Sequence, residues 1–186
     1  MVSMRRPRLL GTCVLVALAF AGVARPASAQ LRADAPTPSS PIDWDRVGEE
    51  TVRVLSDYLR INTTNPPGNE LAAARYLKAI LEREGIEVAI LDTTELGPGR
   101  ANLYARIKGN GTKKAFALVH HMDVVPADAR YWSVDPFGGI VKDGYVWGRG
   151  AQDMRGAGIM QLMALLAVKR SGLPLNRDLV FIANAD

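Results

Sequence analysis

An uninterrupted apolar run at residues 115–119 leads directly into His120 and His121, the only two histidines among 186 residues. A short apolar run of this kind is typical of a strand that is buried on both faces of a sheet. Strands of that type occur mainly in proteins that combine a sheet with covering helices. The run therefore favours an α/β fold and places both histidines at the end of a strand.

The rest of the chain alternates between helical and strand-like spacing of apolar residues. Helical spacing predicts helices over 43–60, 70–84 and 154–170, and Gly85 suits the residue that follows a helix. Alternation predicts strands over 86–90, 103–107 and 179–183, and Asp143-Gly144 predicts a hairpin over 140–146. This order predicts a mixed sheet flanked by helices.

Residues 1–29 have the layout of an export signal. Arginines precede an uncharged apolar run over 9–24, and Ala27-Ser28-Ala29 predicts cleavage before Gln30. The run is short for the roughly 20 residues that span a bilayer, so cleavage is favoured over a lasting membrane anchor. We expect a periplasmic or extracellular protein, with a flexible lead-in over 30–42 and a folded domain over 43–186.

The basic charge of the chain also belongs to this leader. Four of the 23 basic residues lie in residues 1–29, which contain no acid, and the 19 others equal the 19 acidic residues. The folded domain therefore has no basic excess that would favour a nucleic-acid partner. The single cysteine, Cys13, excludes an internal disulfide framework.

Two short motifs carry residues suited to chemistry. In His121-Met122-Asp123, the first and third side chains lie on one side of a strand, where a carboxylate could accept the spare N–H of a metal-bound imidazole. The second motif runs from Gly148 to Asp153, ahead of the helix predicted from Met154. Taken alone, the first motif is more simply a hydrogen-bonded pair at a strand end, and Asp153 more simply a helix N-cap.

Other catalytic patterns are missing from the sequence. A phosphate-binding loop would need Gly-Lys-Ser or Gly-Lys-Thr after the glycines, and no Gly-x-Ser-x-Gly nucleophile motif occurs. Trp132, Pro136 and Phe137 suit loop packing, with a place in a substrate wall as the alternative. Alternating Tyr145 and Trp147 suit packing within the hairpin.

Taken in order, these pieces resemble the M20 family of metallopeptidases, which are co-catalytic zinc exopeptidases and N-acyl amino acid deacylases. Residues 120–126 are similar to its His-x-Asp-x-Val-Pro signature, and residues 148–154 to its second metal motif. Residues 62–70, 100–103 and 132–139 match further family segments in the same order. The resemblance covers essentially all of the chain after the leader and the lead-in.

The resemblance implies roles for three residues and a pair of divalent metal ions. His121 would be a metal ligand, Asp153 would bridge both metals, and Asp123 would orient the imidazole of His121. Zinc suits this donor set best, with cobalt or manganese as substitutes. The implied activity is hydrolysis of small peptides or N-acyl amino acids, in a full-length form that can be a homodimer. Arg155 stands where the family more usually has lysine and keeps the charge.

In the family, the residue that matches Asp186 is followed by two glutamates, a general base and a further ligand. We therefore expect a zinc-exopeptidase-like catalytic domain that is incomplete at its C-terminus and inactive on its own. A non-catalytic binding module or a pseudogene product is the alternative, and an aminopeptidase of a related zinc family is a third. Substrate, metal identity and the choice between peptidase and deacylase stay open at this level.

Overall fold

The computed structural model describes residues 41–93, 95 and 97–185. The predicted export signal, its cleavage before Gln30 and most of the predicted lead-in lie outside these residues, as does Asp186. Within the described part of the chain, no helix is both long and apolar enough to cross a membrane.

The helices and strands follow the predicted order closely. The helices are α2 (Trp44–Leu59), α3 (Glu70–Arg83) and α4 (Gly156–Ser171). The strands are β1 (Glu87–Asp92), β2 (Ala101–Ile107), β3 (Phe116–His121), β4 (Ile140–Lys142), β5 (Tyr145–Trp147) and β6 (Leu179–Asn184). Asp143 and Gly144 both have positive φ angles, of 54° and 79°, and form the predicted turn between β4 and β5.

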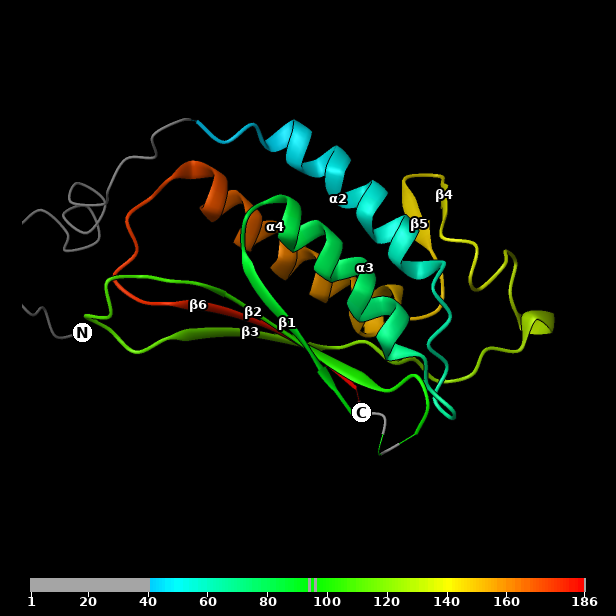
Figure 1. The fold of residues 1–186 in the computed structure, drawn as a ribbon. Coiled ribbons are helices and arrows are strands. Elements are labelled where there is room, and N and C mark those ends of the chain that lie inside the picture. Colours follow the sequence, from blue (N-terminus) through cyan, green and yellow to red (C-terminus); the bar gives the residue numbers. More distant parts are fainter. Residues whose placement is uncertain (1–40, 94, 96, 186) are drawn as a thin grey trace, which may run out of the picture. The chain divides into compact units, whose positions relative to one another are not determined.

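The main sheet has the strand order β1-β2-β6-β3 (Figure 1). The pairs β1–β2 and β2–β6 are antiparallel, whereas β3 and β6 are parallel, so the predicted mixed α/β class is confirmed. The register pairs His121 with Asn184, the last residues of β3 and β6. The carboxyl ends of these two parallel strands therefore meet at one edge of the sheet, where ligand sites of α/β proteins gather.

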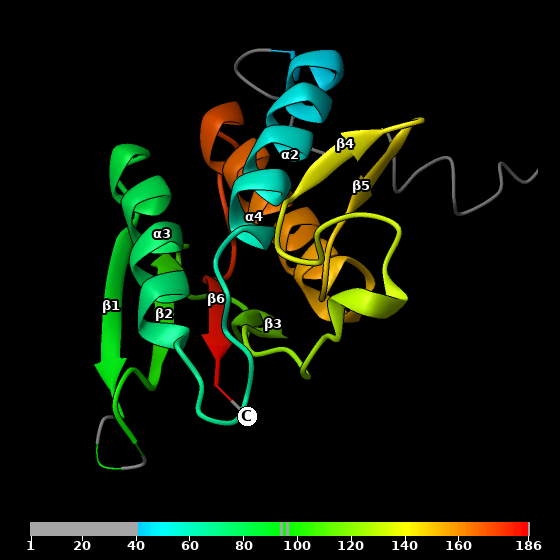
Figure 2. The ribbon, with the colours of Figure 1, turned by 90° about the vertical axis from the view of Figure 1, so that its right-hand side faces the viewer.

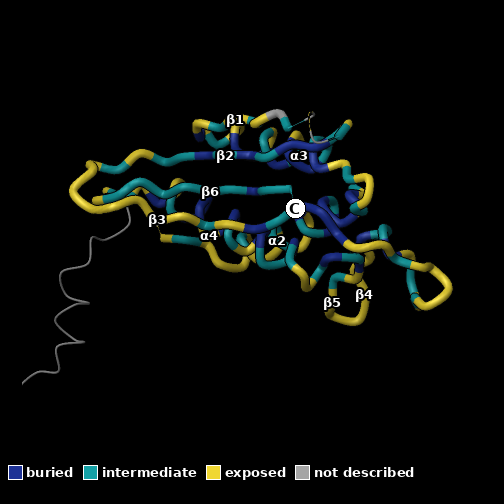
Figure 3. Tube along the Cα trace, turned by 90° about the horizontal axis from the view of Figure 1, so that it is seen from below, coloured by how far each residue is buried: buried dark blue, intermediate teal, exposed yellow. Residues whose placement is uncertain are grey.

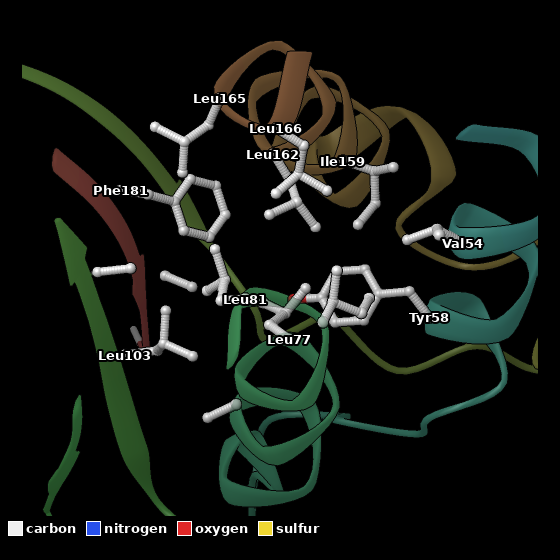
Figure 4. Close-up of a cluster of buried hydrophobic side chains, with 14 of the residues drawn as sticks. Val54, Tyr58, Leu77, Leu81, Leu103, Ile159, Leu162, Leu165, Leu166 and Phe181 are labelled. Carbon is white, nitrogen blue, oxygen red and sulfur yellow. The ribbon is translucent and has the colours of Figure 1, made fainter. Parts of the chain in front are cut away.

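Helices α2, α3 and α4 all lie on one side of the main sheet, as Figures 1 and 2 show from two directions. Their apolar faces close over the sheet in one continuous core, drawn in Figure 4. Its largest fully buried apolar side chains include Tyr58, Leu77, Leu81, Leu103, Leu162 and Phe181. This core fixes the position of α4 against β3 and β6, and so the position of the loop that precedes α4.

The expectation that residues 115–119 are buried on both faces is wrong. Phe116 is 51% exposed and Val119 is 47% exposed, and Figure 3 shows exposed segments along β3. Two features of the described structure explain the difference. Strand β3 lies at an edge of the sheet, and the described helices cover only one of the two faces of that sheet. The continuous apolar run therefore predicted a strand correctly, but it did not predict how far that strand is buried.

Candidate metal centre

The two histidines at the end of β3 point to opposite sides of the strand. His120 is 1% exposed and packs under α4, where its ring centroid lies 5.2 Å from that of Phe181. Its burial against the helix lowers the pKa of His120 to about 4, with the neighbouring His121 and Arg155 adding to the shift. His120 is therefore a neutral core residue, whereas the ring of His121 turns to the other side and faces Asp153, as the alternation of a strand requires.

The imidazole of His121 lies between two aspartates. Its Nε2 atom lies 3.2 Å from Oδ1 of Asp153. Its Nδ1 atom lies 3.1 Å from the backbone oxygen of Asp123 and 3.3 Å from Oδ1 of the same residue. Only the backbone contact meets hydrogen-bond geometry, because Oδ1 of Asp123 is buried without a hydrogen-bond partner. The structure thus brings the three predicted site residues together, with Asp123 holding the ring partly through its main chain.

Asp153 lies in a loop rather than at the N-cap predicted for it. The turn Ala151–Arg155 separates it from α4, which begins at Gly156. Asp153 has φ −121° and ψ 101°, outside the helical region, and the Asp153–Met154 peptide bond is cis. The N-cap positions of the two helical segments are Gly150 and Arg155, not Asp153. The N-cap prediction is wrong because the chain closes an extra turn here, which frees the carboxylate to face His121.

Glycine permits the close approach of this loop to the segment that follows β3. Gly150 has a positive φ of 82°, and a Cβ atom there would lie 2.6 Å from Cγ1 of Val124. The backbone N–H of Arg155 donates to the carbonyl of Gly150 at 2.9 Å and closes the turn. A residue with a side chain at 150 would push Asp153 away from His121.

A pocket of about 810 Å³ surrounds the three side chains. Its wall includes Val125, Trp132, Val146, Trp147, Arg149 and Asn184. The guanidinium of Arg149 lies 5.1 Å from the ring centroid of Trp132, a cation–π distance. Within the hairpin, where packing of Tyr145 and Trp147 was expected, their ring centroids lie 6.1 Å apart, and Trp147 also lines the pocket.

Sequence reasoning missed the wall residues Trp147, Arg149 and Asn184. Arg149 lies inside the Gly148–Asp153 motif. Its position close to the predicted ligand Asp153 could have indicated that it lines the same pocket. Asn184 could not be found in this way, because only the parallel pairing of β6 with β3 brings it opposite His121.

The donor atoms of the centre fit a divalent cation in chemistry and in spacing. Two ligands of one tetrahedral zinc, each about 2.0–2.1 Å from the metal, lie about 3.3 Å apart. Nε2 of His121 and Oδ1 of Asp153 are separated by 3.2 Å. Across residues 41–93, 95 and 97–185, however, no group of three or more His, Cys, Asp or Glu side chains could hold a metal ion. The described residues thus offer His121 and Asp153, fewer than the three protein ligands usual for catalytic zinc.

Comparison with known proteins agrees with this geometry. The family model described as Peptidase family M20/M25/M40 matches residues 117–186, which include β3, the loop carrying Asp153, α4 and β6. Residues 117–186 belong to peptidase family M20. This M20 segment contains all three candidate site residues.

Individual relatives extend the match to much of the chain. Succinyl-diaminopimelate desuccinylase of Rhodospirillum centenum is 37% identical over 129 residues, which are 67% of this chain and 32% of that enzyme. Human carnosine dipeptidase 1 shares the fold with a TM-score of 0.60 and 26% identity, over 79% of this chain and 35% of the other. The M20 metallo-carboxypeptidase Sso-CP2 of Sulfolobus solfataricus gives 0.59 and 25%, over 73% and 30%. The chain spans about a third of the length of these relatives, and the matched fold is that of M20 catalytic domains.

Proposed function

We propose that the protein is a metal-dependent hydrolase of amide bonds in small peptides or N-acyl amino acids. The observation that carries the proposal is the meeting of His121 and Asp153 at the carboxyl end of β3, with 3.2 Å between nitrogen and carboxylate oxygen. Membership of residues 117–186 in M20 supports the reaction class. The names of the relatives, a desuccinylase, a dipeptidase and a metallo-carboxypeptidase, all denote cleavage of an amide bond or an acyl group.

Each candidate residue has a distinct task in this proposal. His121 offers Nε2 to a metal, and Asp153 offers a carboxylate that can bridge to a second one. Asp123 holds the opposite nitrogen of the ring, which selects the tautomer that leaves Nε2 free for the metal. Two bound divalent cations, most readily Zn²⁺, would supply Lewis-acid activation of water and of the scissile carbonyl.

The pocket wall favours a small substrate with both apolar and anionic groups. Val125, Val146 and the two tryptophans offer apolar contacts, and Arg149 adds a cation beside them. Its guanidinium has N–H groups to spare, because Nε makes no hydrogen bond among the described residues and the bond from Nη2 to the Pro126 carbonyl is 3.4 Å long. We propose an acyl group or amino acid that carries a carboxylate.

Further parts of the proposal concern the whole protein. We propose export through the segment 1–29, no nucleic-acid partner, and a homodimeric full-length form. Because the described residues provide too few ligands for a catalytic metal, we also propose that residues 1–186 alone have little or no activity.

The proposal is tested on the protein in the full length that its gene encodes. Bound zinc is counted after dialysis, and hydrolysis is measured on N-succinyl amino acids, N-acetyl amino acids and dipeptides. His121→Ala and Asp153→Asn should each lose bound metal and turnover together. Asp128→Asn is the matched control, since Asp128 is an exposed loop aspartate paired with Arg130. Metal content and turnover that survive His121→Ala would refute the proposed site.

A further inference from the structure

A buried arginine lies directly behind the candidate metal centre. Arg155 ends the turn that carries Asp153, and it is the largest of the fully buried side chains, with no exposed surface. Its guanidinium donates only to uncharged oxygens: the carbonyls of Tyr58, Ile61 and Met122 and the hydroxyl of Thr63. A cation in such a place costs several kcal/mol of desolvation unless its bonds offset the cost. Burial accordingly lowers the pKa of Arg155, opposed by Tyr58, Asp123 and Glu70.

The bonds of Arg155 converge on one backbone carbonyl. Nε and Nη2 each donate to the oxygen of Met122 at 3.1 Å, and the hydroxyl of Thr63 donates to the same oxygen at 2.7 Å. Met122 stands between His121 and Asp123, so three hydrogen bonds hold the peptide that joins the candidate ligand to the residue that orients it. Nη2 also donates to the hydroxyl of Thr63, which closes the cluster.

The same side chain anchors the centre to the end of α2. Nη1 donates to the carbonyls of Tyr58 and Ile61, at 3.1 and 2.9 Å, and the guanidinium carbon lies 5.0 Å from the ring centroid of Tyr58. The planar guanidinium of Arg155 therefore connects the loop of Asp153, the end of β3 and the end of α2.

We propose that Arg155 is a positioning residue that sets His121 and Asp123 at their working distance from Asp153 before metal binds. The inference rests on the proposed function and adds to it a residue that touches neither metal nor substrate. The physical reason is the direct path: one residue, Met154, separates Asp153 from Arg155, and a single carbonyl joins Arg155 to the His121–Asp123 segment. Without this cation, the 3.2 Å contact of His121 with Asp153 is a side-chain link that remains between the two halves of the centre.

The first experiment observes the imidazole of His121 in the metal-free chain. A long-range ¹H–¹⁵N spectrum of the metal-free full-length protein shows its imidazole rings, and comparison with His121→Gln assigns the signals of His121. Arg155→Met, which removes the guanidinium at similar volume, should shift the ring nitrogens of His121. Arg155→Lys should restore them, because an ammonium still reaches the carbonyl of Met122. Arg170→Met is the control, since Arg170 pairs with Glu50 and Glu84 far from this pocket.

The second experiment titrates the same variants with Co²⁺ and follows its absorption spectrum. Loss of a residue that orients metal ligands typically weakens metal binding about 10- to 100-fold, and this loss is expected for Arg155→Met but not for Arg155→Lys or Arg170→Met. A role in core stability alone would lower the melting temperature of Arg155→Met and leave both readouts of the folded chain unchanged, which would overturn the inference.

A second pair of variants keeps the test decisive if Arg155→Met does not fold. Thr63→Val removes the hydroxyl that links Arg155 to Met122 and leaves the buried cation, whereas Thr63→Ser keeps the hydroxyl. The ring signals of His121 should move in the valine variant and not in the serine variant, and identical signals in both would overturn the inference. If the unsubstituted full-length protein binds no Co²⁺, the proposed metal site fails, while the ring signals still decide the role of Arg155.

Discussion

Replacing Gly158 by alanine should destabilise the protein through one contact beside the candidate centre. Gly158 lies in the first turn of α4, directly against the ring of His120. A Cβ atom at this position would lie 2.3, 2.6 and 2.7 Å from Cδ2, Cγ and Nε2 of that ring. The ring has little room to retreat, because Phe181 lies on one side and the hydroxyl of Tyr58 lies 3.4 Å from Nε2.

The expected magnitude combines two opposing effects. Alanine is better than glycine in a helix by about 1 kcal/mol. Overpacking of a well-filled core costs about 1–3 kcal/mol, and three ring atoms inside 2.8 Å place Gly158 at the upper end. The net loss of stability should therefore be about 2 kcal/mol. At Gly48, in the middle of α2, a Cβ atom would meet nothing within 4 Å, so Gly48→Ala should gain roughly 0.5–1 kcal/mol.

Equilibrium unfolding in urea, followed by far-ultraviolet circular dichroism, measures both changes. The decisive comparison repeats Gly158→Ala in a His120→Ala background, where the space of the ring is free. There the substitution should stabilise as it does at Gly48, which gives a coupling energy of about 3 kcal/mol between positions 158 and 120. Equal effects of Gly158→Ala in the two backgrounds would refute the close contact of α4 with β3.

Two further predictions concern the surroundings of the centre. Because burial lowers the pKa of His120 to about 4 from its usual 6.5, its stabilising contribution is complete above about pH 6.5 and is lost as the pH falls towards 4. Urea unfolding should show a loss of stability between pH 7 and 4.5 that is smaller in His120→Gln by about 2–3 kcal/mol, and identical losses would contradict the burial of a neutral ring. Gly139→Ala should cost about 2–3 kcal/mol, because Gly139 has φ 55° and a Cβ atom there would lie 2.1 Å from the carbonyl oxygen of Ser56 in α2. Its melting temperature checks this, and an unchanged value would mean that the loop before β4 does not dock on α2.

The secondary structure was predictable because its signals are local. The spacing of apolar residues in α2, α3 and α4 and the alternation in β1 and β2 reflect one buried face each. Asp143-Gly144 determined the hairpin because few residues other than Asn, Asp and Gly accept two successive positive φ angles. The place of β6 between β2 and β3 depends on pairings between residues at least 63 positions apart, and no local pattern records it.

The candidate site was predictable in its residues but not in its geometry. His121, Asp123 and Asp153 stand in short motifs, and it was the order of these motifs along the chain, through the resemblance to M20, that suggested their roles. The extra turn before α4 could not, since its sequence also fits a helix start with Asp153 as the cap. Arg155 gave no sign of burial, because a lone cation beside glycines usually lies on a solvated face. Only the carbonyls that surround it in the folded chain explain its place.

The opposite orientation of His120 and His121 makes the candidate metal centre sensitive to strand alignment. If β3 slipped by one residue along β6, His120 would enter the pocket and Val119 would take its place beneath α4. The pocket would still contain an imidazole, so the histidines themselves do not distinguish the correct alignment from the shifted one. Two neighbouring features favour the correct alignment. They are the hydrogen bond from the N–H of Met122 to the carbonyl of Asn184 and the space for the His120 ring that Gly158 leaves. A single-residue insertion in β3 would therefore give a protein that retains a histidine in its pocket. That histidine would lack the contacts that His121 makes with Asp123 and Asp153.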